Sequence, residues 1–542
     1  MLLSRLTPIP FHGQDVEIAG LTEDSRKVKP GFLFIATPGT KQDGRAFIED
    51  AVKNGAVAVL IPDEAEDAKL PSPLRGGLGR GECSKKCPVT LAKDFAARLF
   101  RFSNIAPNLA PPSLTLPAGG REYQRAIGEK ISVITAPDIR KATSALASAF
   151  YPRQPETIAA VTGTSGKTST AQFVREIWQA LGHQSASIGT LGLVTATGAG
   201  YGALTTPDAI TMHHLLDDCA KQGITHAALE ASSHGIELNR LDHVRLKAGG
   251  FTNLSRDHLD YHATMEAYLA AKMRLFAELL PRGAAAVLNA DIPEFEVLSK
   301  TATSRGLKII SYGTKGKDLR LIEARPDPRG QILRLEAFGK PIEALLPVIG
   351  SFQAWNALCA AGLVIGSGSA SDAAIAALAK ITGVPGRMQF IGLSAKGGAV
   401  FVDYAHKPDA LENVLRSMRP HVSAHRAKLG VVFGCGGNRD KGKRPIMGGI
   451  AQKQADWAII TDDNPRNEEP ATIRAEILAG CADRTNIQEI SDRAQAIAQG
   501  IAQLNANDVL IIAGKGHEPG QIIGNTVLPF DDADEAQKVL GL

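Results

Sequence analysis

The sequence lacks the features of a membrane or disulfide-stabilised protein. No apolar run reaches the length of a membrane-spanning helix, and the stretch from Met1 to Leu6 is too short for a signal peptide. The six cysteines are scattered, which suits reduced thiols. Cys83 and Cys87 have no second ligand pair nearby, so we expect no zinc site. We therefore expect a cytoplasmic protein without a membrane span.

A strong charge of either sign is also missing. The formal net charge is +4, and residues 71–130 alone carry ten Lys and Arg against four Asp and Glu, so the remainder is about −2. The bulk of the chain therefore gives no support to nucleic-acid binding. The basic part is rich in Gly and Pro, and we predict a disordered insertion at about 66–130, whose charge is either a solvated face or a weak polyanion contact.

The most informative stretch is a phosphate-binding motif. Thr157–Val161 is a short apolar run typical of a buried strand, and residues 171–181 have helical apolar spacing. Between them lies Thr-Gly-Thr-Ser-Gly-Lys-Thr, a shortened P-loop. Such a turn presents backbone N–H groups and a helix N-terminus to an anion, Lys167 adds a positive charge, and the Thr168 hydroxyl suits Mg²⁺. We predict ATP or GTP binding, against the alternative of an ordinary Gly-rich turn.

Two further residues fit this chemistry. Glu230 ends the apolar run from Ala227, and P-loop enzymes place a Mg²⁺ ligand at such a position, although a surface charge is the alternative. Lys272 falls on the apolar stripe of a helix beginning near Met265. Either its stem lies along the surface with the ammonium in solvent, or it is desolvated with a lowered pKa. A neutral amine can take up CO₂ as a carbamate, which could ligate a second Mg²⁺.

The C-terminal part reads as a separate α/β unit. Apolar strands at 429–433, 457–461 and 509–513 are each followed by a loop that carries Gly or Pro and charged residues. In an open parallel sheet such loops gather at one edge, where ligands bind. Tyr151–Pro155 is typical of a linker, and Gly383–Met388 closes the domain that follows it. We therefore predict an α/β protein with domains at 1–152, 153–386 and 387–542.

Motifs along nearly the whole chain, except about 66–130, resemble those of the ATP-dependent Mur ligases and their folylpolyglutamate synthetase relatives. The matching stretches are Asp24–Phe34, Gly163–Thr168, Thr205-Thr206, Glu230, Ser232–Gly235, Asn253–His262, Ala271-Lys272, Asp403–Pro408, Asp463–Arg466 and Gly514–Glu518. The resemblance implies a small N-terminal UDP-binding domain, a central P-loop ATPase domain with a mostly parallel sheet, and a Rossmann-like C-terminal domain.

The resemblance also implies an activity in bacterial peptidoglycan precursor synthesis. ATP would phosphorylate the D-glutamyl carboxylate of UDP-N-acetylmuramoyl-L-alanyl-D-glutamate, and the amine of meso-diaminopimelate would attack the acyl phosphate. A monomer is expected, with Mg²⁺ as cofactor and no nucleic-acid partner.

The roles implied by the resemblance fall on these residues. Lys167, Glu230, His258 and Lys272 would be catalytic, and the metal ligands would be Thr168, Glu230, His258 and Lys272 as its carbamate. ATP would be bound by Gly163, Thr164, Ser165, Gly166, Lys167, Thr168, Ser169, Asn356, Arg387 and Asp403. The muramoyl dipeptide nucleotide would be bound by Ser25, Thr205, Thr206, Ser232 and Arg240. Diaminopimelate would be bound by Arg439, Asp463, Asn464, Pro465, Arg466, Gly514 and Glu518.

Electrostatics favour diaminopimelate because Arg466 can grip its distal carboxylate with two hydrogen bonds, whereas it would repel the ammonium of lysine. Four alternatives stay open at this point: the same reaction with L-lysine, a folylpolyglutamate synthetase-like ligase, a nucleotide-hydrolysing switch or motor, and a nucleic-acid-binding protein that uses the basic insertion.

Overall fold

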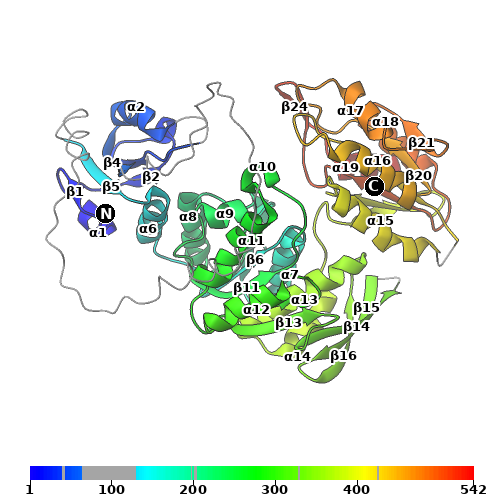
Figure 1. Cartoon of the computed structure of the whole chain (residues 1–542), viewed down its shortest axis with the longest axis horizontal. Helices are drawn as coiled ribbons and strands as arrows, with labels where there is room; N and C mark the ends of the chain where they lie inside the picture. Colours follow the sequence, from blue (N-terminus) through cyan, green and yellow to red (C-terminus); the bar gives the residue numbers. More distant parts are fainter. Residues whose placement is uncertain (40–42, 64–129, 197, 201–203, 328–329, 424–425) are drawn as a thin grey trace, which may run out of the picture. The chain divides into compact units, whose positions relative to one another are not determined.

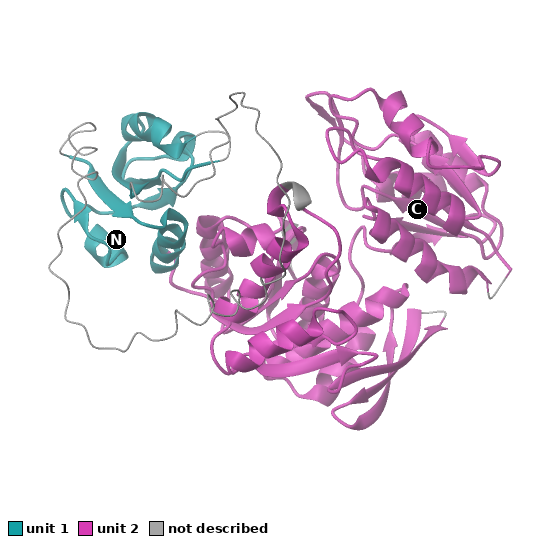
Figure 2. Cartoon of the chain, viewed as in Figure 1, with its two compact units in different colours: residues 1–150 teal, residues 151–542 magenta. Residues whose placement is uncertain are grey.

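The computed structural model describes residues 1–39, 43–63, 130–196, 198–200, 204–327, 330–423 and 426–542. Cys83, Cys87 and the predicted insertion at about 66–130, apart from Lys130, lie outside this range. The chain divides into two compact units, Met1–Phe150 and Tyr151–Leu542 (Figure 2). It is an α/β protein with three main sheets, as predicted (Figure 1). The boundary that we place between residues 386 and 387 stays a prediction. Within the described ranges, no helix has both the length and the apolar character needed to cross a membrane.

The first unit is built on a five-stranded sheet in the order β1-β5-β4-β3-β2, in which only β1 runs antiparallel to its neighbour. Its core is apolar, with Phe34 and Val59 among the fully buried side chains. Ser25 lies in a short 3₁₀ helix that Asp24 caps by accepting the N–H of Arg26. The elements are α1 (Leu3–Leu6), β1 (Phe11–His12), β2 (Gly20–Thr22), η1 (Ser25–Lys27), β3 (Phe32–Ile35), η2 (Gly44–Phe47), α2 (Ile48–Lys53), β4 (Ala56–Pro62), β5 (Ser132–Ala136) and α6 (Ile139–Phe150).

The second unit contains an eleven-stranded sheet in the order β16-β15-β14-β13-β12-β11-β6-β10-β7-β8-β9. Its middle strands, from β14 to β7, are parallel, and antiparallel strands complete both edges. The strands are β6 (Thr157–Thr162), β7 (Ser185–Gly189), β8 (Gly192–Thr195), β9 (Gly198–Gly200), β10 (His226–Glu230), β11 (Leu246–Phe251), β12 (Ala285–Asn289), β13 (Lys308–Gly313), β14 (Leu319–Asp327), β15 (Gly330–Ala337) and β16 (Lys340–Leu346).

Helices cover both faces of this sheet, which explains the continuous apolar run of β6. Ala159 and Val161 pack in the core beneath α7 and α13, whereas Ile158 and Ala160 pack on the opposite face with α8 and α12. The helices are α7 (Lys167–Ala180), α8 (Ala209–Lys221), α9 (Ser233–Glu237), α10 (Leu259–His262), α11 (Met265–Arg274), a π-helical turn (Leu275–Leu279), α12 (Phe295–Ser304), α13 (Ser351–Gly366), α14 (Ser371–Ala376) and η5 (Ala377–Lys380).

A six-stranded sheet follows, in the order β17-β18-β22-β19-β20-β21, with only β17 antiparallel. Its elements are β17 (Gln389–Leu393), β18 (Ala399–Asp403), α15 (Pro408–Ser423), β19 (Leu429–Phe433), α16 (Lys443–Gln454), β20 (Trp457–Ile460), α17 (Pro470–Leu478), β21 (Ile487–Glu489), α18 (Arg493–Ala502), β22 (Val509–Ala513), the hairpin β23 (Gln521–Ile523) and β24 (Thr526–Leu528), and α19 (Asp532–Leu540).

One predicted boundary differs from the structure. Helix α7 begins at Lys167, not near Ala171, because Gly166 adopts φ +85° and turns the chain directly from the loop into the helix. The polar residues Thr168 to Thr170 belong to the first turn, but they gave no apolar signal. The helix N-terminus therefore lies directly at the phosphate loop.

Candidate active site

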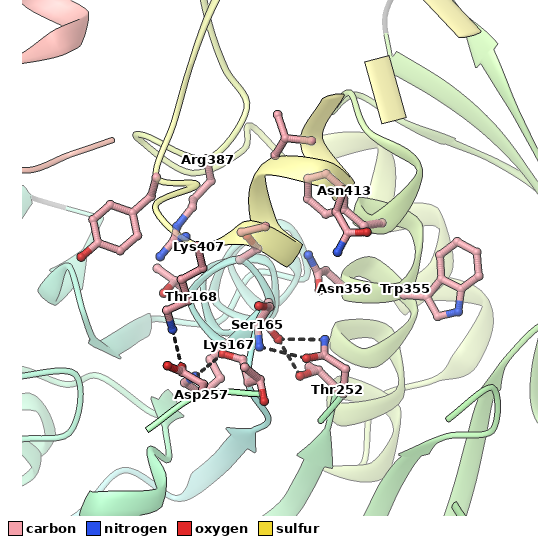
Figure 3. A pocket seen from close by; sticks show the side chains of 18 of the residues that line it. Ser165, Lys167, Thr168, Thr252, Asp257, Trp355, Asn356, Arg387, Lys407 and Asn413 are labelled. Atoms are coloured by element: carbon pink, nitrogen blue, oxygen red, sulfur yellow. Dashed lines mark hydrogen bonds and ion pairs between the residues drawn. The ribbon is translucent and has the colours of Figure 1, made fainter. Parts of the chain in front are cut away.

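The phosphate loop is held in place by the chain that follows β11. Strand β11 pairs in parallel with β6, with Phe251 opposite Thr162, so the next residues run beside the loop. Thr252 donates from its hydroxyl to the Ser165 carbonyl at 2.7 Å, and the Asn253 amide oxygen accepts the Ser165 N–H at 2.9 Å (Figure 3). Asn253 is a site residue that sequence reasoning missed, although it opens a motif used for the resemblance.

Lys167 contacts the backbone of the phosphate loop that it follows. Lys167 donates to the carbonyls of Gly163 and Thr164 at 2.9 and 3.0 Å, and burial lowers its pKa to about 8 despite the nearby Glu230 carboxylate.

Gly166 is required in this loop, because a Cβ there would lie 2.3 Å from the Asn356 side-chain oxygen. Asn356, predicted to contact ATP, is thus packed against the phosphate loop.

Glu230 and Thr168 meet as predicted for a cation site. Glu230 lies opposite Val161 in the register of β10 and β6, which brings its carboxylate to the start of the phosphate loop. Its Oε2 accepts the Thr168 hydroxyl at 3.0 Å, and its Oε1 accepts the Thr190 N–H at 2.7 Å. Burial raises the pKa of Glu230, against the opposing effect of Lys167. Thr190 is a second residue that sequence reasoning missed.

Because Gly189 packs closely on Glu230, a substitution there tests whether the position of the Glu230 carboxylate matters for activity. A Cβ at Gly189 would lie 2.1 Å from Glu230 Oε1, so Gly189→Ala must displace the carboxylate. We expect the substitution to lower turnover about 100-fold and to raise the Mg²⁺ concentration needed for half-maximal rate, since small displacements of catalytic groups cost about that much. Steady-state rates measured across a Mg²⁺ titration would check this.

Gly200 is the matched control, because a Cβ there meets no atom within 4 Å. Gly200→Ala should keep the wild-type Mg²⁺ dependence. Equal behaviour of the two variants would show that the position of Glu230 does not matter for metal binding.

Lys272 is buried, which excludes the alternative of an ammonium in solvent. It is 1% exposed, its Nζ lies 2.8 Å from the Gly163 carbonyl, and it stands 4.3 Å from the centre of the Tyr268 ring. Burial and the nearby Lys167 lower its pKa well below the usual value. Both effects favour the neutral amine. The π-helical turn at Leu275–Leu279 follows the helix that carries it.

His258 lies beside an ion pair that the sequence did not reveal. Asp257 forms an ion pair with Lys407, which follows β18 (Figure 3), and its carboxylate lies 3.2 Å from His258 Nε2. Burial lowers the pKa of His258 to about 4, so the imidazole is neutral at physiological pH, as a metal ligand requires. Lys407 was part of a quoted motif, but nothing in its spacing indicated a partner 150 residues away in sequence.

Twelve of the predicted residues line one cavity of about 480 Å³, together with Asp257, Lys407 and Asn413 (Figure 3). They are Thr164, Ser165, Gly166, Lys167, Thr168, Ser169, Thr205, Glu230, His258, Asn356, Arg387 and Asp403. The volume suits a nucleotide-sized ligand. Three positive side chains, Lys167, Arg387 and Lys407, face this space and would attract a polyphosphate.

Arg387 and Asp403 form the wall of the cavity contributed by the chain around β17 and β18. The Arg387 guanidinium stacks on the Tyr404 ring at 4.5 Å. Asp403 accepts the N–H groups of Met388 and Ala405 at 2.7 and 2.8 Å, and burial raises its pKa to about 6 against the attraction of Arg387. Asp403 is therefore fixed by backbone contacts at the edge of the cavity.

The residues predicted to hold the sugar-peptide part form a cluster beside Glu230. Thr206 donates its hydroxyl to the Glu230 carbonyl at 2.7 Å and lies 2.9 Å from the Ser232 hydroxyl. Arg240 donates to the Thr206 carbonyl at 2.8 Å, and Thr205 accepts from the Thr190 hydroxyl at 3.2 Å. Ser25 lies in the first compact unit, Met1–Phe150.

The residues predicted to select the amino acid gather at the edge of the six-stranded sheet. Glu518 accepts from the Asn464 amide and from the Tyr404 hydroxyl, both at 3.0 Å, so three loops meet there. A Cβ at Gly514 would lie 3.0 Å from the Asp463 carboxylate. Pro465 adjoins this cluster, whereas Arg439 is exposed. Of the described residues that line the cavity, none belongs to this predicted amino-acid set.

Arg466 is positioned mainly by backbone contacts. Its φ is +52°, its N–H donates to the Ile522 carbonyl at 3.0 Å, and its carbonyl accepts the Gly524 N–H at 2.7 Å, so the β23–β24 hairpin holds both sides. Its Nη1 donates to the Gly437 carbonyl at 3.0 Å. Among the described residues, its Nε and Nη2 have no hydrogen-bond partner, which leaves one edge of the guanidinium for a carboxylate.

The donor set fits Mg²⁺ only in part. The hydroxyl of Thr168 and the carboxylate of Glu230 are oxygen donors of the kind that Mg²⁺ prefers. Within the described ranges, no three His, Cys, Asp or Glu side chains are grouped to hold a metal, and no contact joins His258, Glu230 and Lys272. A second cation at this site would therefore need Lys272 to carry the carbamate, whose oxygens would complete the set of ligands.

Comparison with known sequences finds one family along most of the chain. The family model described as Mur ligase middle domain matches residues 161–364, that described as Mur ligase, glutamate ligase domain matches 386–516, and that described as Mur ligase family, catalytic domain matches 17–73.

Two curated relatives are UDP-N-acetylmuramoyl-L-alanyl-D-glutamate–2,6-diaminopimelate ligases. The one from Agrobacterium fabrum is 44% identical over 525 residues, covering 97% of this chain and 94% of that protein. The one from Bradyrhizobium diazoefficiens is 45% identical over 529 residues, covering 97% and 95%.

Solved structures of Mur ligases also match the chain. A UDP-N-acetylmuramoyl-L-alanyl-D-glutamate–2,6-diaminopimelate ligase structure matches with a TM-score of 0.65 and 31% identity, covering 100% of this chain and 99% of that chain. MurF ligase from Thermotoga maritima in complex with ADP matches with a TM-score of 0.57 at 18% identity over 96% of each chain, which shows the shared fold.

Proposed function

The chain belongs to the Mur ligase family of ATP-dependent, amide-forming ligases, and we propose that it joins meso-diaminopimelate to UDP-N-acetylmuramoyl-L-alanyl-D-glutamate in peptidoglycan precursor synthesis. The observation that carries the proposal is the pairing of a nucleotide-sized cavity around the phosphate loop with a separate loop cluster around Arg466. A monomer in the bacterial cytoplasm is part of the same proposal.

The proposed reaction has two steps. The γ-phosphoryl group of ATP passes to the D-glutamyl γ-carboxylate, and ADP leaves. The amine of diaminopimelate then attacks the acyl carbon, the carbon–oxygen bond to phosphate breaks, and the amine releases a proton. Catalysis of phosphoryl transfer consists mostly of positioning and charge stabilisation.

The chain's own groups supply this positioning. Lys167 and the backbone N–H groups at the start of α7 would hold the β- and γ-phosphates. Arg387 would contact the ribose or phosphate, Asp403 the ribose and Asn356 adenine, and all three side chains line the cavity. The cluster of Thr205, Thr206, Ser232 and Arg240 holds the sugar-peptide part beside Glu230, and Ser25 binds the uridine-diphosphate end.

Thr168 and Glu230 would hold one Mg²⁺, and His258, Glu230 and the Lys272 carbamate would hold a second. The bound ions supply neutralisation of the charge between the phosphates and the acceptor carboxylate. The low pKa of Lys272 supports the carbamate, because only the neutral amine attacks CO₂, with loss of a proton. Burial against Gly163 and Tyr268 explains why this amine is neutral.

The loop cluster would choose the amino acid. Arg466 presents a free guanidinium edge to the distal carboxylate of diaminopimelate, and Arg439 binds a second carboxylate. Glu518 and the Gly514 backbone, with Asp463, Asn464 and Pro465 as neighbours, accept the distal amine. Lysine lacks the distal carboxylate, so it would leave Arg466 unpaired in this pocket.

The test is an assay of phosphate release by the purified protein with ATP and the muramoyl dipeptide nucleotide. We expect meso-diaminopimelate to stimulate release at least about 100-fold more efficiently than L-lysine, since loss of one charge-assisted bidentate contact costs about 3 kcal/mol. Equal stimulation by both would contradict the choice of amino acid, and release without either amine would favour a nucleotide-hydrolysing switch.

A further inference from the structure

A fully buried arginine on a helix that packs against the six-stranded sheet has no part in the reaction described above. Arg444, on α16, is 0% exposed, and its guanidinium forms ion pairs with Glu468 at 3.0 Å and Glu476 at 2.6 Å. Its Nη2 also donates to the Gly436 carbonyl at 3.1 Å. Burial of charged groups costs several kcal/mol per ion unless they are well paired, and apolar residues often serve stability equally well. The position of this group therefore suggests another role.

One of the two carboxylates joins the two loops that carry the predicted selecting arginines. Glu468 follows Arg466 by two residues, and its carboxylate accepts the N–H of Asn438, the neighbour of Arg439. The side-chain oxygen of Asn438 accepts the N–H of Asn467 at 3.0 Å. The ion pairs with Arg444 thus fix a carboxylate that both loops share.

Direct contacts between the loops depend on the same arrangement. Gly437 donates its N–H to the Asn464 carbonyl at 2.9 Å, and its own carbonyl accepts from Arg466 Nη1 at 3.0 Å. Arg444 also donates to Gly436 in the loop after β19, so its guanidinium supports both loops where they meet. We call this contact between the two loops the junction. The Arg444 bonds hold the pKa of Glu468 down to about 2, so this carboxylate stays ionised at any working pH.

Glu476 provides a natural contrast. It lies on α17 and shares the Nη1 atom of Arg444 with Glu468. Within the described part of the chain, Glu476 makes no hydrogen bond to either loop. The two glutamates therefore bind the same arginine but differ in whether they touch the loops.

We propose that Arg444 and Glu468 are positioning residues that set the distance and orientation between Arg439 and Arg466, and thereby the preference for an amino acid with two carboxylates. The inference rests on the proposed function. Bidentate recognition of a carboxylate depends on geometry, and a shift of about 1 Å in a positioned group costs roughly 100-fold. A junction without its central carboxylate would let the two loops move independently.

The experiment compares Glu468→Ala with Glu476→Ala in the full-length enzyme. We expect Glu468→Ala to raise KM for diaminopimelate about 10- to 100-fold and to reduce discrimination against lysine, with KM for ATP within about twofold of wild type. Glu476→Ala should lose comparable thermal stability but change KM for diaminopimelate less than about threefold. Glu468→Gln, which keeps an oxygen for the Asn438 N–H, should recover part of the affinity.

Equal KM values for the two alanine variants would overturn the inference, because both glutamates would then act only through stability. If Glu468→Ala does not fold, Arg444→Lys replaces it: a lysine has one donor atom and cannot span Glu468 and Gly436, so an unchanged KM for diaminopimelate would equally refute the role. Wild-type phosphate release that does not depend on diaminopimelate would instead refute the proposed function itself.

Discussion

Lys272→Ala is expected to lower turnover by at least about 10³-fold while leaving the protein folded enough to bind ATP. The proposed carbamate supplies an anionic ligand close to the transferred phosphoryl group, and the loss of such electrostatic stabilisation has effects of this size. The side chain lies against Gly163 and Tyr268, so its removal leaves a small cavity next to the phosphate loop. The measurement is the steady-state rate of phosphate release, with ATP binding followed separately.

Two controls separate the carbamate from a purely structural role for Lys272. Short carboxylates such as acetate or formate should partly restore the activity of Lys272→Ala, because they can replace the missing anion. Lys272→Met fills the space that the alanine variant leaves open, so added carboxylates should restore its activity no more than they restore that of Lys272→Ala. In wild-type protein, ¹³CO₂ should give a carbamate ¹³C resonance that Lys272→Ala lacks. Full activity of the alanine variant would rule out the carbamate.

Arg466→Asn is expected to raise KM for diaminopimelate about 100-fold or more while KM for ATP changes little. The substitution removes the free guanidinium edge, and a bidentate, charge-assisted contact of about 3 kcal/mol corresponds to that factor. Asparagine is the better replacement here because it tolerates the left-handed backbone found at this position, with φ +52°. Initial rates measured while each substrate is varied would give both KM values.

Arg466→Lys is the charge-preserving control. It keeps a positive charge but loses the planar pair of donors, so we expect it to recover only part of the affinity for diaminopimelate. A proportional loss on ATP and diaminopimelate in either variant would mean that Arg466 supports the fold of the loop and does not select the amino acid.

The sequence predicted those features that depend on local chemistry. The phosphate loop and Glu230 at the end of β10 followed from residue type, apolar spacing and position after a strand. For Lys272 the apolar spacing left a solvent-exposed ammonium and a desolvated amine both open, and the structure decides for the buried position. The loops after β19, β20 and β22 were also expected at one edge, and the structure confirms this. Asn464 in the loop after β20 bonds both to Glu518 in the loop after β22 and to Gly437 in the loop after β19.

Contacts between distant segments were not predictable in this way. The ion pair of Asp257 with Lys407 spans 150 residues, and the support of Asn438 by Glu468 depends on Arg444 from a third segment. Neither has a periodic signal, because each partner taken alone resembles an ordinary surface charge. The start of α7 was misplaced for a different reason: the conformation of Gly166, which apolar spacing does not report, decides it.

The left-handed backbone at position 466 limits which residues can replace Arg466 during evolution. Hairpin contacts at Ile522 and Gly524 hold that conformation whatever side chain is present, so the loop can accept a new residue without being rebuilt. Valine or isoleucine would be strained there by their branched Cβ, irrespective of the amino acid to be bound. Evolutionary exchange of substrate preference at this site should therefore pass through asparagine, glycine or unbranched residues.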